Sequence, residues 1–303
     1  VVFTTGMTGY LETITDPSYY GQIVVQTFPM IGNYGVIPQD FENKEVYLSA
    51  YIVKEWCQDP SNFRSSGNLD TFFKERKVPA IYGIDTRKLA KTIREYGSMN
   101  GRLTVKKPPY GPEELEQIRN FRITSAVESV TPAGCHLIKT TGKADYRVVL
   151  WDFGAKENIL RELTKRGCDV YDATASTTAD EILALDPDGI MLSNGPGNPE
   201  DNARVIEELK KLILHQDCID KVAGELKIVY SPLHGTGNIP VRRILKELGF
   251  ENVYVVKEQE LPDGEFPTVS YPNPEAEEAF ELGLKLAKEV DADLVLATDP
   301  DAD

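Results

Sequence analysis

Apolar and polar residues alternate regularly along the second half of the chain. Three short apolar runs predict strands, and an amphipathic stretch after each run predicts a helix. The strands are expected at 147–152, 169–173 and 188–193, and the helices at 156–166, 178–184 and 202–214. Alternating strands and helices of this length are typical of a parallel, doubly wound sheet.

The same alternation continues toward the end of the chain. Strands are expected at 226–231, 252–257 and 293–298, and helices at 240–248 and 275–289. We therefore predict an α/β protein whose second half is a doubly wound, mostly parallel sheet. In this hypothesis strand 226–231 extends the sheet of strands 147–152 and 188–193. The alternative is two half-domains joined by residues 215–225.

The first part of the chain has a different pattern, with short strands and many turns. It predicts a strand at 44–56, helices at 68–76 and 86–96, and a further helix near 112–120. Leu89, Ile93 and Tyr96 share one face of the helix at 86–96. We expect a mixed α+β domain at 1–130, followed by domains at 146–214 and 221–303. The chain opens inside an apolar strand, which suggests a truncated start.

Charge and cysteine content narrow the classes of function. The formal net charge is -15, and residues 218–303 hold 18 acidic against 8 basic side chains. An acidic chain repels phosphate backbones, so we expect no nucleic acid partner. No apolar run has the length of a membrane span, so no membrane association is expected. Four widely spaced cysteines, without zinc-site spacing, favour reduced thiols and a cytoplasmic location: Cys57, Cys135, Cys168 and Cys218.

Several sequence motifs in the first 215 residues, in a fixed order along the chain, identify a family. They are VVFTTGMTGYLETITDPSYY (1–20), IGNYG (31–35), SNFR (61–64), GIDTR (83–87), MNG (99–101), DFGAKENILREL (152–163) and LSNGPGNPEDN (192–202). Because of these motifs, the segment resembles the small subunit of carbamoyl phosphate synthetase, whose second half is a class I glutamine amidotransferase domain. The resemblance implies a subunit that hydrolyses L-glutamine and passes ammonia to a large synthetase subunit. Its product, carbamoyl phosphate, serves arginine and pyrimidine biosynthesis.

The resemblance also implies a glutamine-binding site. Gly195 and Gly197 would let the substrate approach the backbone, and their N–H groups would serve the glutamine and its oxyanion. Ser18 would also contact the glutamine. The alternatives are a tight strand-to-helix turn for the two glycines, and for Ser18 a turn hydroxyl that caps its own backbone.

The catalytic nucleophile of the amidotransferase family has no counterpart in this sequence. That nucleophile is a cysteine on a sharp turn between a strand and a helix, where this chain reads HQDCIDKVAGELKIVYSPLHGTGN (215–238). Cys218 precedes the strand, lacks flanking glycines and has only His215 as a nearby imidazole, so it is a poor candidate. We therefore assign no catalytic residue. We expect His136 and His215 to be ordinary solvated side chains.

Residues from about 218 to the end resemble a different family. The words KIVYSPLHGTGN (227–238), PVRRILKELGF (240–250), LPDGEFPTVSYPNPE (261–275) and DADLVLATDPDAD (291–303) are similar to the metal-loop domain of a phosphohexomutase, a phosphoglucomutase or phosphomannomutase. This resemblance implies that Asp299, Asp301 and Asp303 hold Mg²⁺, since alternate carboxylates at a strand end can converge on a hard cation. The alternative is a solvated acidic segment. The phosphoserine loop and the sugar-binding domains of that family have no counterpart here.

The chain is thus expected to be a chimera with a junction near 208–220. Three functions compete: a glutamine-handling subunit that is catalytically inert, a phosphohexomutase fragment that binds Mg²⁺, and a recombination product without a function of its own. The length of the match favours the first as the family assignment.

Overall fold

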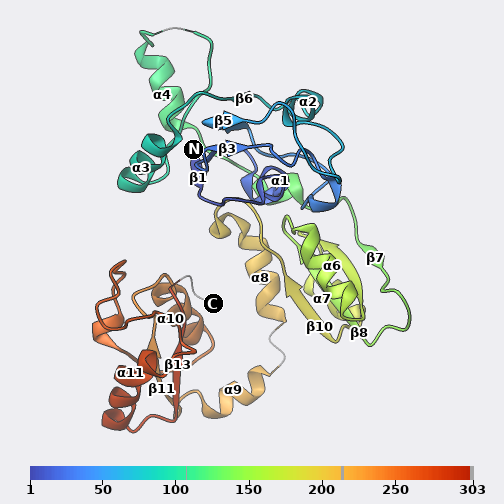
Figure 1. The fold of residues 1–303 in the computed structure, drawn as a ribbon. Coiled ribbons are helices and arrows are strands. Elements are labelled where there is room, and N and C mark those ends of the chain that lie inside the picture. Colours follow the sequence, from blue (N-terminus) through green and yellow to red (C-terminus); the bar gives the residue numbers. More distant parts are fainter. Residues whose placement is uncertain (107, 213–214, 301–303) are drawn as a thin grey trace. The chain divides into compact units, whose positions relative to one another are not determined.

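The computed structural model describes residues 1–106, 108–212 and 215–300 (Figure 1). The chain divides into two compact units, Val1–Lys211 and Leu212–Asp303. This division falls inside the predicted junction of the two resembled families. Among the described residues, no helix is both long and apolar enough to cross a bilayer.

The N-terminal part of the first unit is built on short parallel strands. A four-stranded sheet has the order β1-β2-β4-β6, with β1 at Val2–Thr4, β2 at Ile23–Gln26, β4 at Ala50–Ile52 and β6 at Ala80–Ile81. Strands β3 (Met30–Ile31) and β5 (Glu55–Trp56) form a separate parallel pair. The predicted strand at 44–56 is therefore two strands, β4 and β5, in different sheets.

This region also contains helices. They are α1 (Tyr10–Thr15), α2 (Leu69–Glu75), α3 (Thr86–Tyr96), α4 (Pro112–Asn120) and α5 (Ala126–Val130), so the helices expected at 68–76, 86–96 and near 112–120 are confirmed. The Asp85 carboxylate caps the start of α3 by accepting a hydrogen bond from Lys88 N at 3.0 Å. Ile93 of α3 packs into an apolar cluster with Val25 and Ile52. Tyr96, at the end of the helix, has a side chain that is 78% exposed.

A second sheet completes the first unit, with the order β10-β8-β9-β7. Its strands are β7 (His136–Ile138), β8 (Tyr146–Asp152), β9 (Cys168–Thr174) and β10 (Gly189–Leu192), with α6 (Glu157–Lys165), α7 (Ala179–Ala184) and α8 (Ala203–Lys211) between and after them. Strands β8, β9 and β10 pair in parallel, as predicted, whereas β7 pairs antiparallel to β9. The amphipathic face of α6 packs on Leu150 and Val170 of the sheet. The predicted helix at 202–214 ends at Lys211 in the structure, and residues 213–214 lie outside the described residues.

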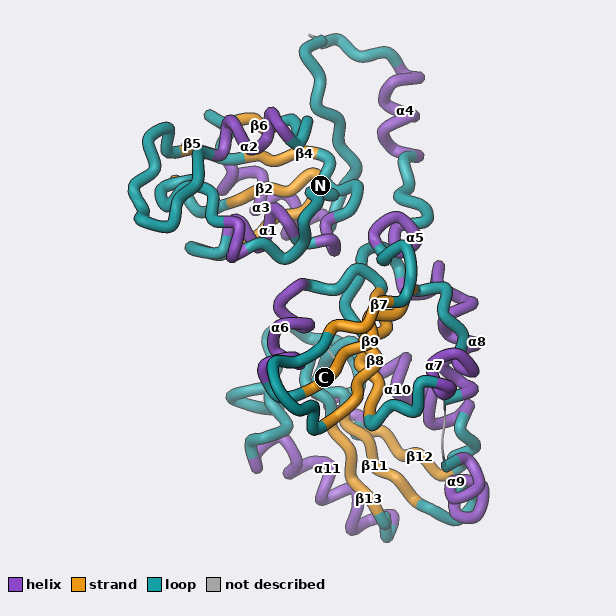
Figure 2. Tube along the Cα trace, turned by 90° about the vertical axis from the view of Figure 1, so that its right-hand side faces the viewer, coloured by secondary structure: helices purple, strands orange, loops and turns teal. Residues whose placement is uncertain are grey.

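The second unit contains a three-stranded parallel sheet with the order β12-β11-β13. The described elements are α9 (Gln216–Val222), β11 (Lys227–Ser231), α10 (Asn238–Glu247), β12 (Asn252–Val255), α11 (Glu277–Val290) and β13 (Leu294–Ala297). Helix α11 lies against the sheet, and Gly283 lets it approach closely, since an added Cβ would be 3.1 Å from Val295 (Figure 2). Helix α9 was not predicted.

The α/β fold class is confirmed, but the prediction of one continuous sheet is wrong. Strand β11 pairs with β12 on one side and β13 on the other, and a strand has only two hydrogen-bonding edges. It therefore cannot also pair with β8 or β10. The connection from β10 to β11 holds two helices, α8 and α9, where a simple crossover has one. The alternative of two half-domains describes the strand pairing.

Candidate functional site

Two loops meet at the carboxyl ends of the neighbouring strands β8 and β10. The backbone N–H of Phe153 donates to Ser193 Oγ at 2.8 Å, and Asn194 Nδ2 donates to the carbonyl of Gly154 at 3.1 Å. The N–H of Lys156 donates to Asn194 Oδ1 at 3.3 Å. The side chain of Asn194 thus connects the loop after β10 to the loop after β8. The carboxyl edge of a parallel sheet is where α/β proteins bind ligands.

Ser18 joins these loops from the N-terminal part of the chain. Asn194 Nδ2 also donates to Ser18 Oγ at 2.8 Å, across 176 residues of sequence. The neighbouring Asp16 accepts a hydrogen bond from Ser18 N at 2.8 Å and pairs with Lys156 Nζ at 3.1 Å. The hydroxyl of Ser18 therefore accepts from another loop. The structure brings together Ser18 and the glycine loop, which the sequence predicted separately.

The two positions of the loop require glycine for different structural reasons. A Cβ on Gly195 would lie 2.5 Å from the carbonyl oxygen of Phe153, so this glycine allows two backbone segments to pack closely. Gly197 has a φ of 83°, a left-handed conformation that side chains disfavour. Among the described residues, no acceptor takes a hydrogen bond from the N–H of Gly195 or of Gly197. Both N–H groups remain available to a ligand.

A cavity of about 250 Å³ lies beside this loop. Its lining is mostly apolar and includes Phe153, Leu192, Leu209 of α8 and residues 195–197. An apolar cavity with a few convergent polar groups is the usual form of a small-molecule site.

Two carboxyl groups lie behind the loop after β8. Asp152 Oδ1 accepts hydrogen bonds from the N–H groups of Gly154 and Ala155, both at 2.6 Å, and so fixes the turn. Asp172 on the neighbouring strand β9 is half-buried, and its Oδ1 is buried with no hydrogen-bond partner among the described residues. Burial, followed by the charge of Asp152, raises the pKa of Asp172 to about 7. The sequence did not predict a role for Asn194, Asp152 or Asp172. Asn194 and Asp152 nevertheless lie in the motifs LSNGPGNPEDN and DFGAKENILREL that carry the family resemblance.

Cys218 belongs to the second compact unit, whereas the glycine loop belongs to the first. It lies on α9, ahead of β11, and its side chain is exposed. The ligand atoms of His215, Asp217 and Cys218 lie within 4.8 Å of one another, all on exposed side chains. His215 and His136 are exposed, as predicted. The third histidine, His234, is buried, with its ring nitrogens 3.1 Å from Leu261 O and 2.9 Å from Thr268 Oγ1.

The start of the predicted metal loop is held by the turn after β11. Thr236 N donates to the carbonyl of Pro300 at 2.8 Å, and a Cβ on Gly235 would lie 2.3 Å from Pro300 Cα. The turn at 234–237 therefore shapes the backbone that follows β13. Asp299 is placed at the carboxyl edge of the sheet, whereas the predicted ligands Asp301 and Asp303 lie outside the described residues.

Comparison with known proteins assigns the segments of the chain to families. Residues 1–103 match the model described as "Carbamoyl-phosphate synthase small chain, CPSase domain", and residues 149–218 match "Glutamine amidotransferase class-I". Residues 203–303 match "Phosphoglucomutase/phosphomannomutase, alpha/beta/alpha domain II". The two last matches overlap at 203–218, where the two compact units also divide.

The fold and the loop after β10 thus define the later part of the first unit as a class I glutamine amidotransferase segment. More particularly, the chain is similar to the carbamoyl phosphate synthase small chain. It is 50% identical over 213 residues to that protein from a strain of Bacillus cereus, which covers 70% of this chain and 57% of the relative. It is 48% identical over 224 residues to that of Listeria monocytogenes and 45% over 225 residues to that of Symbiobacterium thermophilum; both cover 72% of this chain and 61% of the relative.

Both resemblances noted in the sequence are confirmed. The chain spans about three fifths of the length of the small-chain relatives.

Proposed function

We propose that the first unit is the glutamine-handling part of a carbamoyl phosphate synthetase small subunit and still binds L-glutamine. The observation that carries the proposal is the hydrogen bond between Asn194 and Ser18. It joins the Asp16-Pro17-Ser18 turn to the loop that holds Gly195 and Gly197. The hydroxyl of Ser18 and the free N–H groups of the two glycines would bind the polar groups of glutamine, next to the apolar cavity.

The role that this proposal implies comes from the family resemblance noted in the sequence. A small chain of this kind would supply ammonia to a large synthetase subunit, for the carbamoyl phosphate used in arginine and pyrimidine biosynthesis. The large subunit would be the protein partner and L-glutamine the small-molecule ligand. A cytoplasmic location goes with this role.

We further propose that this chain binds glutamine without hydrolysing it. Hydrolysis in this class proceeds through a cysteine thiolate activated by a nearby base. Cys218 is exposed on a helix of the other compact unit and has no oxyanion-binding loop around it in the sequence. The cysteines described in the first unit, Cys57, Cys135 and Cys168, lie outside the loop after β10.

Isothermal titration of the purified chain with L-glutamine tests the proposal. We expect saturable binding that Gly197→Ala weakens, because the substitution strains the loop, while Ser61→Ala on an exposed loop leaves it unchanged. Ammonia release should stay at the background rate in the chain and in Cys218→Ser alike. Absence of glutamine binding would refute the binding site, and ammonia release that Cys218→Ser abolishes would refute the inert state.

A second candidate function rests on the match of residues 203–303 to a phosphoglucomutase/phosphomannomutase domain. In this alternative Asp299, Asp301 and Asp303 would hold Mg²⁺ through carboxylate oxygens, and the ion would neutralise charge on a bound phosphate. Conversion of glucose 1-phosphate to glucose 6-phosphate by this chain should nevertheless be undetectable, because the sequence has no phosphoserine loop. A coupled assay with turnover that depends on Mg²⁺ would contradict this expectation.

The combination of the two segments is best explained as a chimera, and we propose a junction near 208–220. The family matches overlap there, and the structure has separate sheets on the two sides. A recombination product without a function of its own would then bind neither glutamine nor Mg²⁺. Sequencing the source nucleic acid across codons 205–225 tests the chimera, since a continuous reading frame supports it and a break refutes it.

A further inference from the structure

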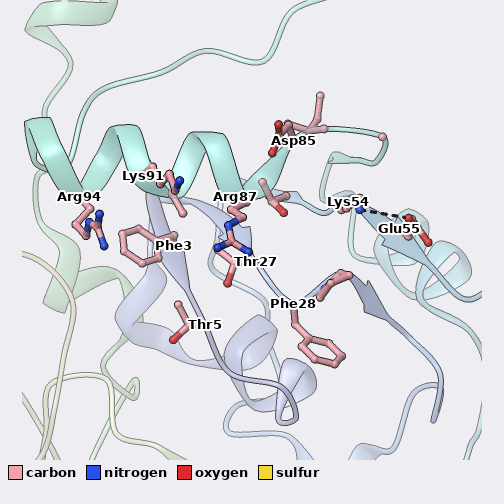
Figure 3. Close-up of a pocket in the computed structure, with 15 residues that line it drawn as sticks. Phe3, Thr5, Thr27, Phe28, Lys54, Glu55, Asp85, Arg87, Lys91 and Arg94 are labelled. Atoms are coloured by element: carbon pink, nitrogen blue, oxygen red, sulfur yellow. Dashed lines mark ion pairs between the residues drawn. The ribbon is translucent and has the colours of Figure 1, made fainter.

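A second cavity of the first unit is separate from the one beside the glutamine loop and has its own chemistry. It has a volume of about 920 Å³ and shares no lining residue with the site of Ser18 and Asn194. Helix α3 forms one wall, and the segments that follow β1, β2, β4 and β6 form the others (Figure 3). The cavity therefore opens at the carboxyl edge of the four-stranded parallel sheet, where open α/β sheets bind their ligands.

The cavity is cationic although the chain as a whole is acidic. Arg87, Lys91 and Arg94 follow one another at helical spacing, so they occupy one face of α3 and line the same wall. All three are exposed side chains, and no ion pair or side-chain hydrogen bond joins them to another described residue. Figure 3 shows them reaching from α3 toward Phe3 and Thr27.

The acidic side chains of the cavity offset these three charges only in part. Glu55 pairs with Lys54, with Nζ and Oε1 3.8 Å apart. Asp85 caps α3 through its hydrogen bond with Lys88 N. The lining holds four basic side chains, with Lys54 among them, against the two acidic ones, so its net charge is +2. A concave site of this charge attracts and concentrates anions.

The remaining wall offers hydroxyl groups and aromatic rings. Thr5 and Thr27 lie below the basic side chains, and the rings of Phe3 and Phe28 border the same space (Figure 3). Arginine forks bind phosphate through paired N–H donors, hydroxyls add further donors, and aromatic rings cover an organic body. We propose that this cavity binds a small organic molecule that carries phosphate groups, with Arg87, Lys91 and Arg94 as its anion ligands.

Titration of the full chain with inorganic pyrophosphate, without divalent cations, tests the proposal. We expect saturable binding that weakens as salt rises, since screening reduces the attraction. Arg87→Ala and Arg94→Ala should each weaken binding about tenfold or more, the effect of losing a charged hydrogen-bonding partner. Lys88→Ala is the matched control, because Lys88 is on the same helix but outside the cavity, and it should bind like the wild type.

A conservative variant and a second anion test whether the site is specific for phosphate. Arg87→Lys keeps the charge and removes the fork, so it should fold and still bind pyrophosphate less tightly. Citrate, a carboxylate anion of similar charge, should bind more weakly than pyrophosphate. Equal binding of citrate would overturn the assignment of phosphate. No saturable binding, or binding that Arg87→Ala, Arg94→Ala and Arg87→Lys all leave intact, would overturn the site.

Discussion

Asn194 donates one hydrogen bond to Ser18 Oγ at 2.8 Å and another to the carbonyl of Gly154 at 3.1 Å. One amide group therefore connects three segments that are distant in the sequence. Two of these segments follow neighbouring parallel strands, and the third belongs to the N-terminal region. The geometry of the candidate glutamine site depends on this one side chain.

This dependence predicts that Ser18 and Asn194 act as a unit. Ser18→Ala should lower the free energy of unfolding of the first unit by about 1 kcal/mol, the usual net value of a hydrogen bond. Asn194→Ala should cost more, because it also loses the bond to Gly154. The double variant should cost no more than Asn194→Ala alone, since the shared bond is lost only once.

Unfolding of the first unit can be followed separately for this purpose. The chain has two tryptophans, Trp56 and Trp151, and both lie in this unit. Urea titration with tryptophan fluorescence gives the four free energies of the double-mutant cycle. Strictly additive effects would show that the two side chains do not interact.

The sequence predicted the secondary-structure elements better than the tertiary contacts between them. Strands β8, β9 and β10 and the helices between them follow from apolar runs and helical spacing, which are local properties. The close packing of Gly195 against the Phe153 carbonyl is a contact that only the folded loops reveal. Pairing of β11 was mispredicted because strand periodicity does not specify the partner of a strand.

The cationic cavity was missed for a related reason. Leu89 and Ile93 predict the helix at 86–96, but they carry no information about its basic side chains. The signal was the spacing of Arg87, Lys91 and Arg94 on one helical face in an acidic chain. The cavity itself depends on the parallel alignment of β1, β2, β4 and β6, whose short strands give weak sequence patterns.

Asp172 should make the first unit less stable as pH rises. Its pKa is about 7 in the folded protein, above the ordinary value of 3.8, because burial and the charge of Asp152 favour the protonated form. Glu157 at the start of α6 adds a further negative charge near Asp172. On the neighbouring strand β7, His136 is the residue paired with Asp172. The folded state therefore holds this proton more tightly than the unfolded state does.

The free energy of unfolding should consequently fall between about pH 4 and pH 7 and level off above. Asp172→Asn should remove this slope and raise the free energy of unfolding at pH 8 by about 1–2 kcal/mol, after allowance for partial solvent screening. Urea titrations at pH 5 and pH 8 measure the effect, with the exposed Asp180→Asn as the control. A slope that persists in Asp172→Asn would assign it to another group.

Gly235→Ala should destabilise the second unit. The added Cβ would lie 2.3 Å from Pro300 Cα, and the hydrogen bond from Thr236 N to Pro300 O limits how far the two segments can separate. Overpacking of this kind costs about 1–3 kcal/mol. Hydrogen exchange of the β11 and β13 amides should accelerate in Gly235→Ala. It should stay unchanged in Gly264→Ala, where an added Cβ meets nothing within 4 Å. Equal exchange in both variants would contradict the packing role of Gly235.

Strand β10 is an edge of its sheet, and this edge predicts self-association. Among the described residues β10 pairs only with β8, and its Met191 and Leu192 side chains are 40% and 43% exposed. An edge strand with unpaired backbone groups and apolar side chains can pair with another chain.

We expect sedimentation velocity to show oligomers that grow with protein concentration. Met191→Lys should shift the distribution toward the monomer, because a charge on an edge opposes pairing. Leu183→Lys, which replaces a similarly exposed leucine on α7, should leave it unchanged. If the two variants reduce association equally, apolar surface in general drives it and the β10 edge has no special part.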